Sequence, residues 1–259
     1  MTMNWRESEQ KKCTSVHFHH RCSWHSFRDR KMAGATADVR THLLRHYAMS
    51  AGVLPFAVAP NGQVFFLIGR ERERVGRHIY KRHVWCDFGG GISPRTHSLI
   101  GACREFAEET IGIVVGNGTN SATIDFVSKH VCENQPIRSM FGSSVPYDMY
   151  LIEIAYEEDL PKRFLERRQL AERIDACKEL AGVMPQRYFH KSGRMRDAFL
   201  EKDMLSWITW EELQTACTSS WKDSSLLTPI RLRREFSATI SCHLHAIASA
   251  VSKGTAKKK

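Results

Sequence analysis

Two short apolar runs near residue 60 constrain the fold of this chain more than any other feature. They are GVLPFAVA at residues 52–59 and QVFFLIG at residues 63–69, and only Pro60, Asn61 and Gly62 separate them. An Asn-Gly step accepts the positive φ angles of a tight turn, and β-branched and aromatic residues favour strands. The sequence therefore predicts a β-hairpin over residues 52–69.

The rest of the chain mixes strand and helix patterns without regular alternation. The charged stretch RERERVGRHIYKRH at residues 70–83 is expected to be a loop, and further patterns predict strands at 122–131, 147–156 and 204–210. We expect helices from Pro161 to Gly182, at 211–217, and from Thr228 and Pro229 onward. Isolated helices between strands predict an α+β fold, a mixed sandwich. In the last helix one apolar stripe is expected to pack on the domain: Ile230, Phe236, Ile240, Leu244, Ile247 and Val251.

Both ends of the chain differ from its centre. Residues 1–40 show neither a helical nor a strand period, so we expect a disordered extension, with an organelle-targeting segment as the alternative. His17, His19, His20 and Cys22 in that extension are expected to be a polar tail rather than a metal site. The domain is expected to cover residues 41–252, with a helical insertion at 160–182, a C-terminal helix at 229–251 and a basic tail at 253–259.

Composition limits the compartment and the partners. The eight cysteines are scattered without a C-x-x-C pair, which favours reduced thiols and an intracellular, cytoplasmic location; a mitochondrial location is the alternative. No stretch approaches the roughly 20 apolar residues that a membrane-spanning helix needs, so no membrane is expected among the partners. The net charge of +10 and the pI near 9.3 favour polyanions such as nucleic acids, nucleotides and inositol phosphates.

The stretch REFAEETIGI at residues 104–113 carries three acids on two helical turns and follows Gly89, Gly90 and Gly91. At about 100° per residue the three carboxylates share an arc of roughly 100°, and we expect them on the outward face of an amphipathic helix. Acids this close repel one another unless cations neutralise them, and Mg²⁺ or Mn²⁺ suits oxygen ligands. An ordinary solvated helix is the alternative, but a glycine loop before the acids favours a metal-bridged phosphate.

The stretch GGGISPRTHSLIGACREFAEETIGI resembles the box of the Nudix hydrolases, G-x5-E-x7-R-E-U-x-E-E-x-G-U, where U is aliphatic. Gly90 falls on the first glycine, and Arg104, Glu105, Phe106, Glu108 and Glu109 fall on the helix core. Thr96 replaces the upstream Glu, and Ile111 is one extra residue before Gly112. Downstream, Glu201 lies six residues before Trp207 and its acidic neighbours Glu211 and Glu212, which also matches the family. The resemblance covers about residues 50–217 and implies a Nudix-type α/β/α sandwich with a mixed sheet.

The resemblance implies hydrolysis of a nucleoside diphosphate linked to another group. By this resemblance Glu108 and Glu109 would be the main Mg²⁺ or Mn²⁺ ligands with the Gly89 carbonyl, and Arg104 would orient the acids. Glu105 would be a further ligand or the general base. Glu201 would be an additional ligand or the alternative base, with Glu153, Glu157 and Glu158 as competitors and a plain surface role also open. Thr96 would remove a brace from the loop rather than a ligand.

The substrate is less constrained than the reaction. Arg70, Arg77, Lys81 and Arg82 precede the glycines and are candidates for phosphate contacts, although they are equally consistent with solvated loop charges. The basic insertion and the net charge favour capped or triphosphorylated RNA, dinucleoside polyphosphates or diphosphoinositol polyphosphates. The alternative function is a non-catalytic Nudix-fold module that binds RNA or a partner protein.

Overall fold

The computed structural model describes residues 49–75, 78–93, 96–115, 120–131, 135–141, 145–181, 184–196, 199–218 and 230–256. The expected extension at 1–40, Arg77, the Thr228–Pro229 helix start and residues 257–259 lie outside these ranges. The division of the chain into domain and extensions therefore stays a prediction.

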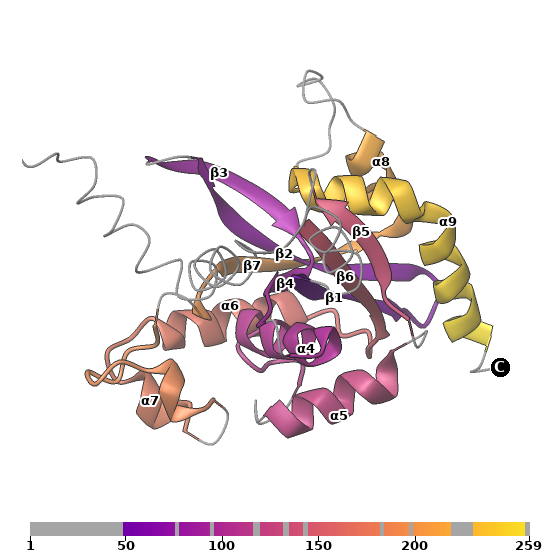
Figure 1. Ribbon diagram of the computed structural model, residues 1–259. Helices are drawn as coiled ribbons and strands as arrows, with labels where there is room; N and C mark the ends of the chain where they lie inside the picture. Colours follow the sequence, from indigo (N-terminus) through magenta and orange to yellow (C-terminus); the bar gives the residue numbers. More distant parts are fainter. Residues whose placement is uncertain are drawn as a thin grey trace, which may run out of the picture.

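A seven-stranded mixed sheet forms the centre of the molecule (Figure 1), with the order β3-β2-β1-β6-β5, β4 paired to β1 and β7 paired to β2. The predicted hairpin is confirmed, because β1 and β2 pair antiparallel across a turn in which Gly62 has a φ of 83°. β6 lies parallel to β1, which makes the sheet mixed. The strands are β1 (Ser50–Val58), β2 (Val64–Val75), β3 (His78–Cys86), β4 (Phe88–Gly91), β5 (Ile137–Phe141), β6 (Val145–Glu153) and β7 (Lys202–Thr209).

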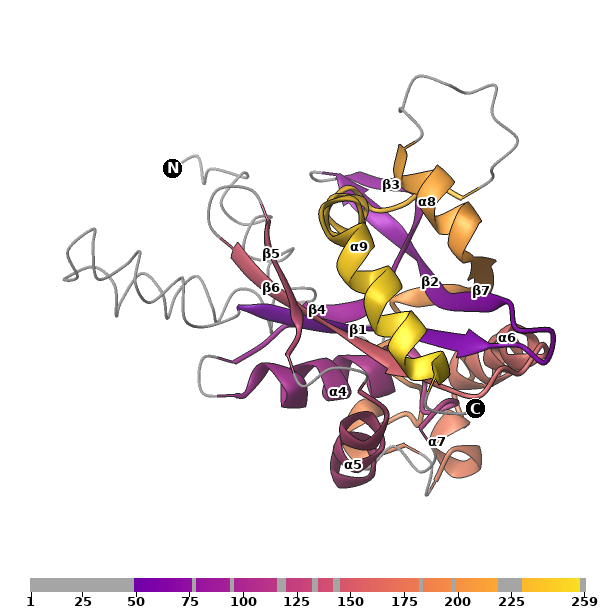
Figure 2. The same cartoon turned by 90° about the vertical axis from the view of Figure 1, so that its right-hand side faces the viewer.

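Helices cover both faces of the sheet. On one face Phe106 and Phe164 pack with Leu67 in the larger core. On the other face Phe236 packs with Phe66 in the second core. The first face carries α4 (Ser98–Glu109), α5 (Asn120–His130), α6 (Leu160–Ala171) and α7 (Ala176–Glu179), and the second carries α8 (Trp210–Thr218) and α9 (Arg234–Ala256), as Figures 1 and 2 show. The expected α+β sandwich is confirmed.

The C-terminal helix buries most of its expected stripe but starts later than expected, because the backbone at 231–233 pairs with Trp85 of β3 and leaves Ile230 before the helix. Phe236, Ile240, Ile247 and Val251 are buried against the sheet and α8. α9 starts at Arg234 and continues to Ala256, with one non-helical residue inside, His243. Among the residues with defined positions, no helix is both long and apolar enough to cross a membrane.

Three expectations about secondary structure are wrong. The charged stretch at 70–83 is not a loop: it forms the outer parts of β2 and β3, because its alternating Arg and Glu residues suit the two faces of a strand. Residues 122–131 are not a strand but mostly α5, because Ile124, Val127 and Val131 recur at helical spacing against the larger core. The helix from Pro161 does not reach Gly182: it ends at Ala171, and α7 follows after a turn in which Ile174 is exposed.

The composition of residues 160–182 gives no sign of the break between α6 and α7. Helix formers are abundant on both sides of it, so propensity alone predicts one helix. In the structure the Cys177 amide donates to the Gly193 carbonyl at 2.9 Å, which ties α7 to the segment at 184–196. The strands β4 and β5 were not predicted, because the first is mostly glycine and the second is a short edge strand.

Candidate functional site

The three glycines form β4 and bring the backbone against the acids of α4. A Cβ atom on Gly90 would lie 2.6 Å from the Glu105 carboxyl carbon, so only glycine leaves that carboxylate its place. Gly89 lies opposite Gly52 on β1, and side chains at either position would meet the Tyr147 hydroxyl and nearby backbone. The glycines are thus needed for the close approach of β4, β1 and α4.

Arg104 links the acids to β4. Its Nη1 donates to Glu108 Oε2 at 2.8 Å, and its Nη2 donates to Glu105 Oε1 at 2.5 Å and to the Gly91 carbonyl at 3.1 Å. These acceptors all come from α4 and β4. Thr96, at the position of the family's upstream Glu, uses its amide to bond the Ser93 carbonyl at 2.9 Å. Arg104 is therefore held by three acceptors that do not include Thr96.

The paired acids do not face solvent, which corrects the expectation of an outward acidic face. Glu108 is 6% exposed and Glu109 is 4% exposed. Helical periodicity showed which residues share a face but not that β7 and the segment at 184–196 cover this one. Glu108 Oε1 accepts a hydrogen bond from the Tyr188 hydroxyl at 3.1 Å. Burial raises the pKa of Glu108 to about 7, although the Arg104 guanidinium opposes the shift.

Glu109 is only half satisfied. Its Oε1 lies 3.4 Å from the Lys202 Nζ, while its Oε2 is buried and has no hydrogen-bond partner among the described residues. Burial raises the pKa of Glu109 well above its usual value, even though Lys202 favours the ionised form. A bound cation or a proton would satisfy the Oε2 atom of this carboxylate.

Lys202, the first residue of β7, places an ammonium group inside the acid cluster. Its Nζ lies 3.1 Å from Glu71 Oε2 and donates to Cys86 Sγ at 2.9 Å. Arg233 Nη1 lies 3.0 Å from the other oxygen of Glu71. Burial alone would raise the pKa of Glu71, but Lys202 and Arg233 outweigh it and lower that pKa to about 2. Burial opposes the charge on Lys202, yet its anionic neighbours raise the pKa of the ammonium well above the usual value.

The oxygen donors fit a divalent cation. Carboxylate oxygens of Glu71, Glu109 and Glu201 lie within 4.8 Å of one another, and hard ions such as Mg²⁺ and Mn²⁺ prefer such ligands, although the Lys202 ammonium already contacts Glu71 and Glu109. The buried, unpartnered Oε2 of Glu109 is the atom that a bound ion would satisfy. Glu105, Glu108 and Glu109 all come from one helix, and Glu201 joins them from the residue before β7.

Arg70, the candidate phosphate-contact residue whose side chain is described, lies apart from this cluster. Arg70 is on the opposite face of the sheet, where its Nε contacts Asp203 Oδ1 at 2.7 Å and its guanidinium stacks over Trp85. The side chains of Lys81 and Arg82 are outside the described part of the chain, as is Arg77. The competitors of Glu201 lie at the end of β6 and beyond it: Glu153 ends β6, Glu157 contacts Arg163, and Glu158 is exposed.

Sequence reasoning missed Glu71, Lys202 and Tyr188. Glu71 was hidden in the stretch predicted to be a loop, although its alternation with arginines is a strand signal. Lys202 follows the predicted Glu201 directly, but charge alone does not indicate burial. Tyr188 reaches Glu108 from a 3-10 turn at Gln186–Tyr188, after the predicted insertion, a contact without a sequence signal.

Ile111 ends the acidic helix in an unusual conformation. Its φ is 51°, and Gly112 follows with a φ of 62°. A positive φ is rare for a β-branched residue, but the Ile111 side chain is buried and Arg167 of α6 donates to its carbonyl at 3.2 Å. This departure from the family pattern thus lies at the helix exit, beyond the acids.

No family model and no curated protein matches the chain. Among solved structures, a Nudix hydrolase from M. smegmatis, RenU, is similar at 12% identity and a TM-score of 0.35, over 78% of this chain and 87% of that one. A C. elegans Ap4A hydrolase complex has 18% identity and a TM-score of 0.29, over 42% and 68%. The T. brucei MERS1–RNA complex has 12% identity and a TM-score of 0.35, over 68% and 56%. Identities and scores this low do not assign the chain to a family, so its function is argued from its own residues.

Proposed function

We propose that the chain is a Mg²⁺- or Mn²⁺-dependent pyrophosphohydrolase of the Nudix type that cleaves a phosphoanhydride in a nucleoside diphosphate-X substrate. The observation that carries the proposal is the buried Glu109, which lies beside the acids bound by Arg104 and has one oxygen without a partner in the part of the chain that the structure describes. An unsatisfied buried carboxylate is costly, and a divalent ion at this place would remove the cost.

The proposed roles follow the contacts. Glu108 and Glu109 hold the ion with the Gly89 carbonyl, and Arg104 and Tyr188 keep Glu108 in one orientation. Glu201 is a further ligand or a base at the start of β7. Glu105 is packed against Gly90 and bonded to Arg104, so it is placed to bind the ion or to accept a proton from water. When bound, the ion neutralises phosphate charge and lowers the pKa of the attacking water.

Phosphate contacts are expected from Arg187, in the segment at 184–196, rather than from Arg70. Arg187 is exposed, and its guanidinium lies 5.1 Å from the centre of the Tyr188 ring, next to the Tyr188 bond to Glu108. Arg70, in contrast, is already paired with Asp203 on the other face. A cation beside the acids suits a highly charged substrate: capped or triphosphorylated RNA, a dinucleoside polyphosphate or a diphosphoinositol polyphosphate.

The test is a hydrolysis screen of these substrates with and without Mg²⁺ or Mn²⁺, using wild type, Glu108→Gln and Glu166→Gln. Glu166 is exposed on α6, so its variant is a matched control for the loss of one carboxylate. We expect metal-dependent turnover that falls at least about 10²-fold in Glu108→Gln and stays unchanged in Glu166→Gln. Absence of turnover with every substrate, or equal rates in both variants, would contradict the proposal.

The second candidate function is a non-catalytic module that binds RNA or a partner protein. Lys202 favours it, because an ammonium already neutralises part of the acid cluster. RNA binding that persists in EDTA and in Glu108→Gln, without turnover of any substrate, would support this function instead.

A further inference from the structure

Lys202 is an unusual neighbour for carboxylates that are proposed to hold a divalent ion. Its side chain is 1% exposed, and its Nζ lies 3.1 Å from Glu71 and 3.4 Å from Glu109. It thus bridges two acids that come from different elements, β2 and α4. A bridging divalent ion in a carboxylate site has the same relation to its ligands.

The surroundings are shaped to hold this ammonium. A Cβ atom on Gly69 would lie 2.8 Å from the Lys202 Cδ, so the lysine stem needs a glycine beneath it. The Nζ also donates to Cys86 Sγ and lies 5.9 Å from the centre of the Phe88 ring. A buried ammonium with several anionic or electron-rich neighbours is a fixed charge rather than a solvent-facing side chain that happens to point inward.

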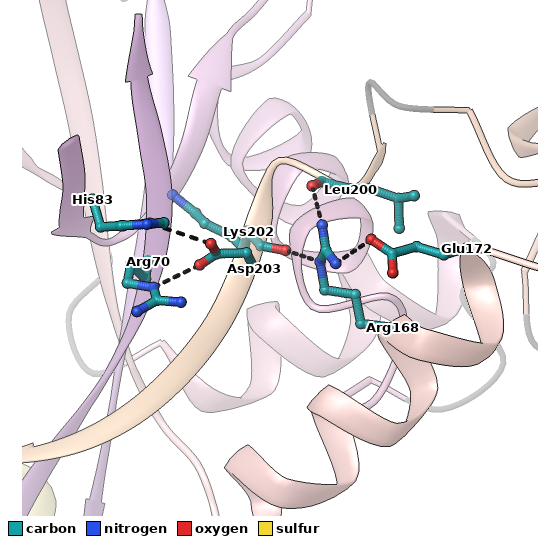
Figure 3. A network of polar contacts seen from close by, with 7 residues as sticks. All are labelled: Arg70, His83, Arg168, Glu172, Leu200, Lys202 and Asp203. Carbon is teal, nitrogen blue, oxygen red and sulfur yellow. Dashed lines mark hydrogen bonds and ion pairs between the residues drawn. The ribbon is translucent and has the colours of Figure 1, made fainter. Parts of the chain in front are cut away.

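The backbone at Lys202 is fixed from α6. Arg168 Nε donates to the Lys202 carbonyl at 2.8 Å and its Nη2 to the Leu200 carbonyl at 3.4 Å, while Nη1 pairs with Glu172 (Figure 3). Arg168 therefore holds the backbone on both sides of Glu201, at the start of β7. These contacts limit how far Lys202 can withdraw from the acids.

We propose that the Lys202 ammonium is a built-in cation, which holds the position between Glu71 and Glu109 that a second divalent ion would otherwise take. The chain then binds a divalent ion on the Oε2 side of Glu109 and none between Glu109 and Glu71. The ion at Glu109 Oε2 rests on the proposed function, whereas the role of Lys202 between Glu71 and Glu109 does not. A covalently attached cation keeps Glu71 neutralised at any metal concentration, which a dissociable ion does not.

The geometry allows the replacement to be tested. Two oxygens that share a Mg²⁺ ion lie at most about 4.2 Å apart, twice a bond of about 2.1 Å, and Mn²⁺ takes similar oxygen ligands. The donor oxygens of Glu71, Glu109 and Glu201 already lie within 4.8 Å of one another. Small shifts would therefore suffice for an ion to enter if the lysine side chain were shortened.

The experiment counts Mn²⁺ ions per chain by electron paramagnetic resonance in wild type, Lys202→Ala and Lys202→Met. Lys202→Ala opens the position, whereas Lys202→Met removes the charge but fills the same space. We expect Lys202→Ala to bind one more Mn²⁺ than wild type and Lys202→Met to bind no additional ion. Saturating Mn²⁺ should raise the melting temperature of Lys202→Ala by several degrees more than that of wild type or Lys202→Met.

A labelling measurement on wild type decides the matter if the variants do not fold. Acetylation followed by mass spectrometry should modify the exposed Lys191 and leave Lys202 unmodified, both with and without Mn²⁺. Labelling of Lys202 after Mn²⁺ addition would mean that the ion displaces the lysine, which overturns the inference.

The outcomes separate this inference from the proposed function. If wild type binds Mn²⁺ and Lys202→Ala binds no more, the built-in cation is wrong and the proposed function stands. If wild type binds none and Lys202→Ala binds one ion, the built-in cation stands and the metal site of the proposed function fails. If no form of the chain binds Mn²⁺, both fail.

Discussion

Strands β2 and β7 each contribute residues to two ion clusters, which lie on opposite faces of the sheet. Arg70 and Glu71 are neighbours in β2, and Lys202 and Asp203 are neighbours in β7. Arg70 pairs with Asp203 on the α9 face, together with His83 (Figure 3), while Glu71 pairs with Lys202 on the α4 face. The chemistry of the two clusters is alike, and their surroundings differ.

Burial distinguishes the two clusters. The side chains of Arg70 and Asp203 are 26% and 12% exposed, so water screens and partly solvates this pair. Lys202 is 1% exposed and faces Glu109, which has a buried oxygen that no described residue satisfies. Water can replace a lost partner of Arg70 or Asp203, and also of Glu71, whose side chain is 14% exposed, but not of Lys202 or Glu109. The cluster around Lys202 and Glu109 is therefore the one in which a buried carboxylate oxygen is available to bind an ion.

The largest expected effect comes from breaking the buried cluster. Lys202→Met should lower the free energy of unfolding by about 3–5 kcal/mol in the absence of metal, because it leaves the buried Glu109 without the ammonium that faces it and leaves Glu71 with Arg233 alone. Urea unfolding followed by circular dichroism measures this. Arg70→Met is the control, because it removes a cation of similar length from the residue next to Glu71. It should lower the free energy of unfolding by about 1 kcal/mol or less. Equal losses in the two variants would show that burial does not separate the clusters.

A smaller effect is expected at the other end of the buried cluster. Tyr188→Phe removes the hydroxyl that donates to Glu108 and should lower the free energy of unfolding by about 1.5 kcal/mol, because that carboxylate keeps Arg104 as a partner. It should also weaken Mn²⁺ binding, measured by the same resonance titration. Tyr156→Phe is the control, since Tyr156 contributes ring contacts with Phe65 and Trp207. A Tyr156→Phe loss as large as that of Tyr188→Phe would argue against the Glu108 bond.

Local patterns in the sequence were sufficient for part of the site. The glycine run, Arg104 and the three acids of α4 lie within 21 residues, Gly89 to Glu109, and helix geometry alone relates their positions. The hairpin of β1 and β2 followed from an Asn-Gly turn between apolar runs. In both cases the residues that interact are close in the sequence.

The remaining part depends on contacts between distant segments. Glu71 and Lys202 are 131 residues apart, and they meet because β2 pairs with β7 in one register. No periodicity in either segment indicates that register. The outward orientation expected for the acids failed for the same reason: Tyr188 and Lys202, which cover and partly satisfy them, come from segments 80 or more residues away. Burial of charge is a tertiary property, so hydrophobic patterning does not reveal it.

The smallest expected effect comes from the partly exposed pair of Arg70 and Asp203, and its salt dependence sharpens the comparison. Asp203→Asn should cost about 0.2–1 kcal/mol, because it weakens the pair with Arg70 while water remains available to both groups. This loss should shrink when urea unfolding is repeated in 1 M salt, where the Debye length is about 3 Å. Glu71→Gln is the matched variant on the α4 face, and its larger loss should persist in the same salt, because the partner ammonium of Lys202 is 1% exposed and packs against Gly69, Phe88 and Cys86. A loss in Glu71→Gln that salt removes would mean that water enters the Lys202 cluster, and Lys202 would then be a screened surface charge.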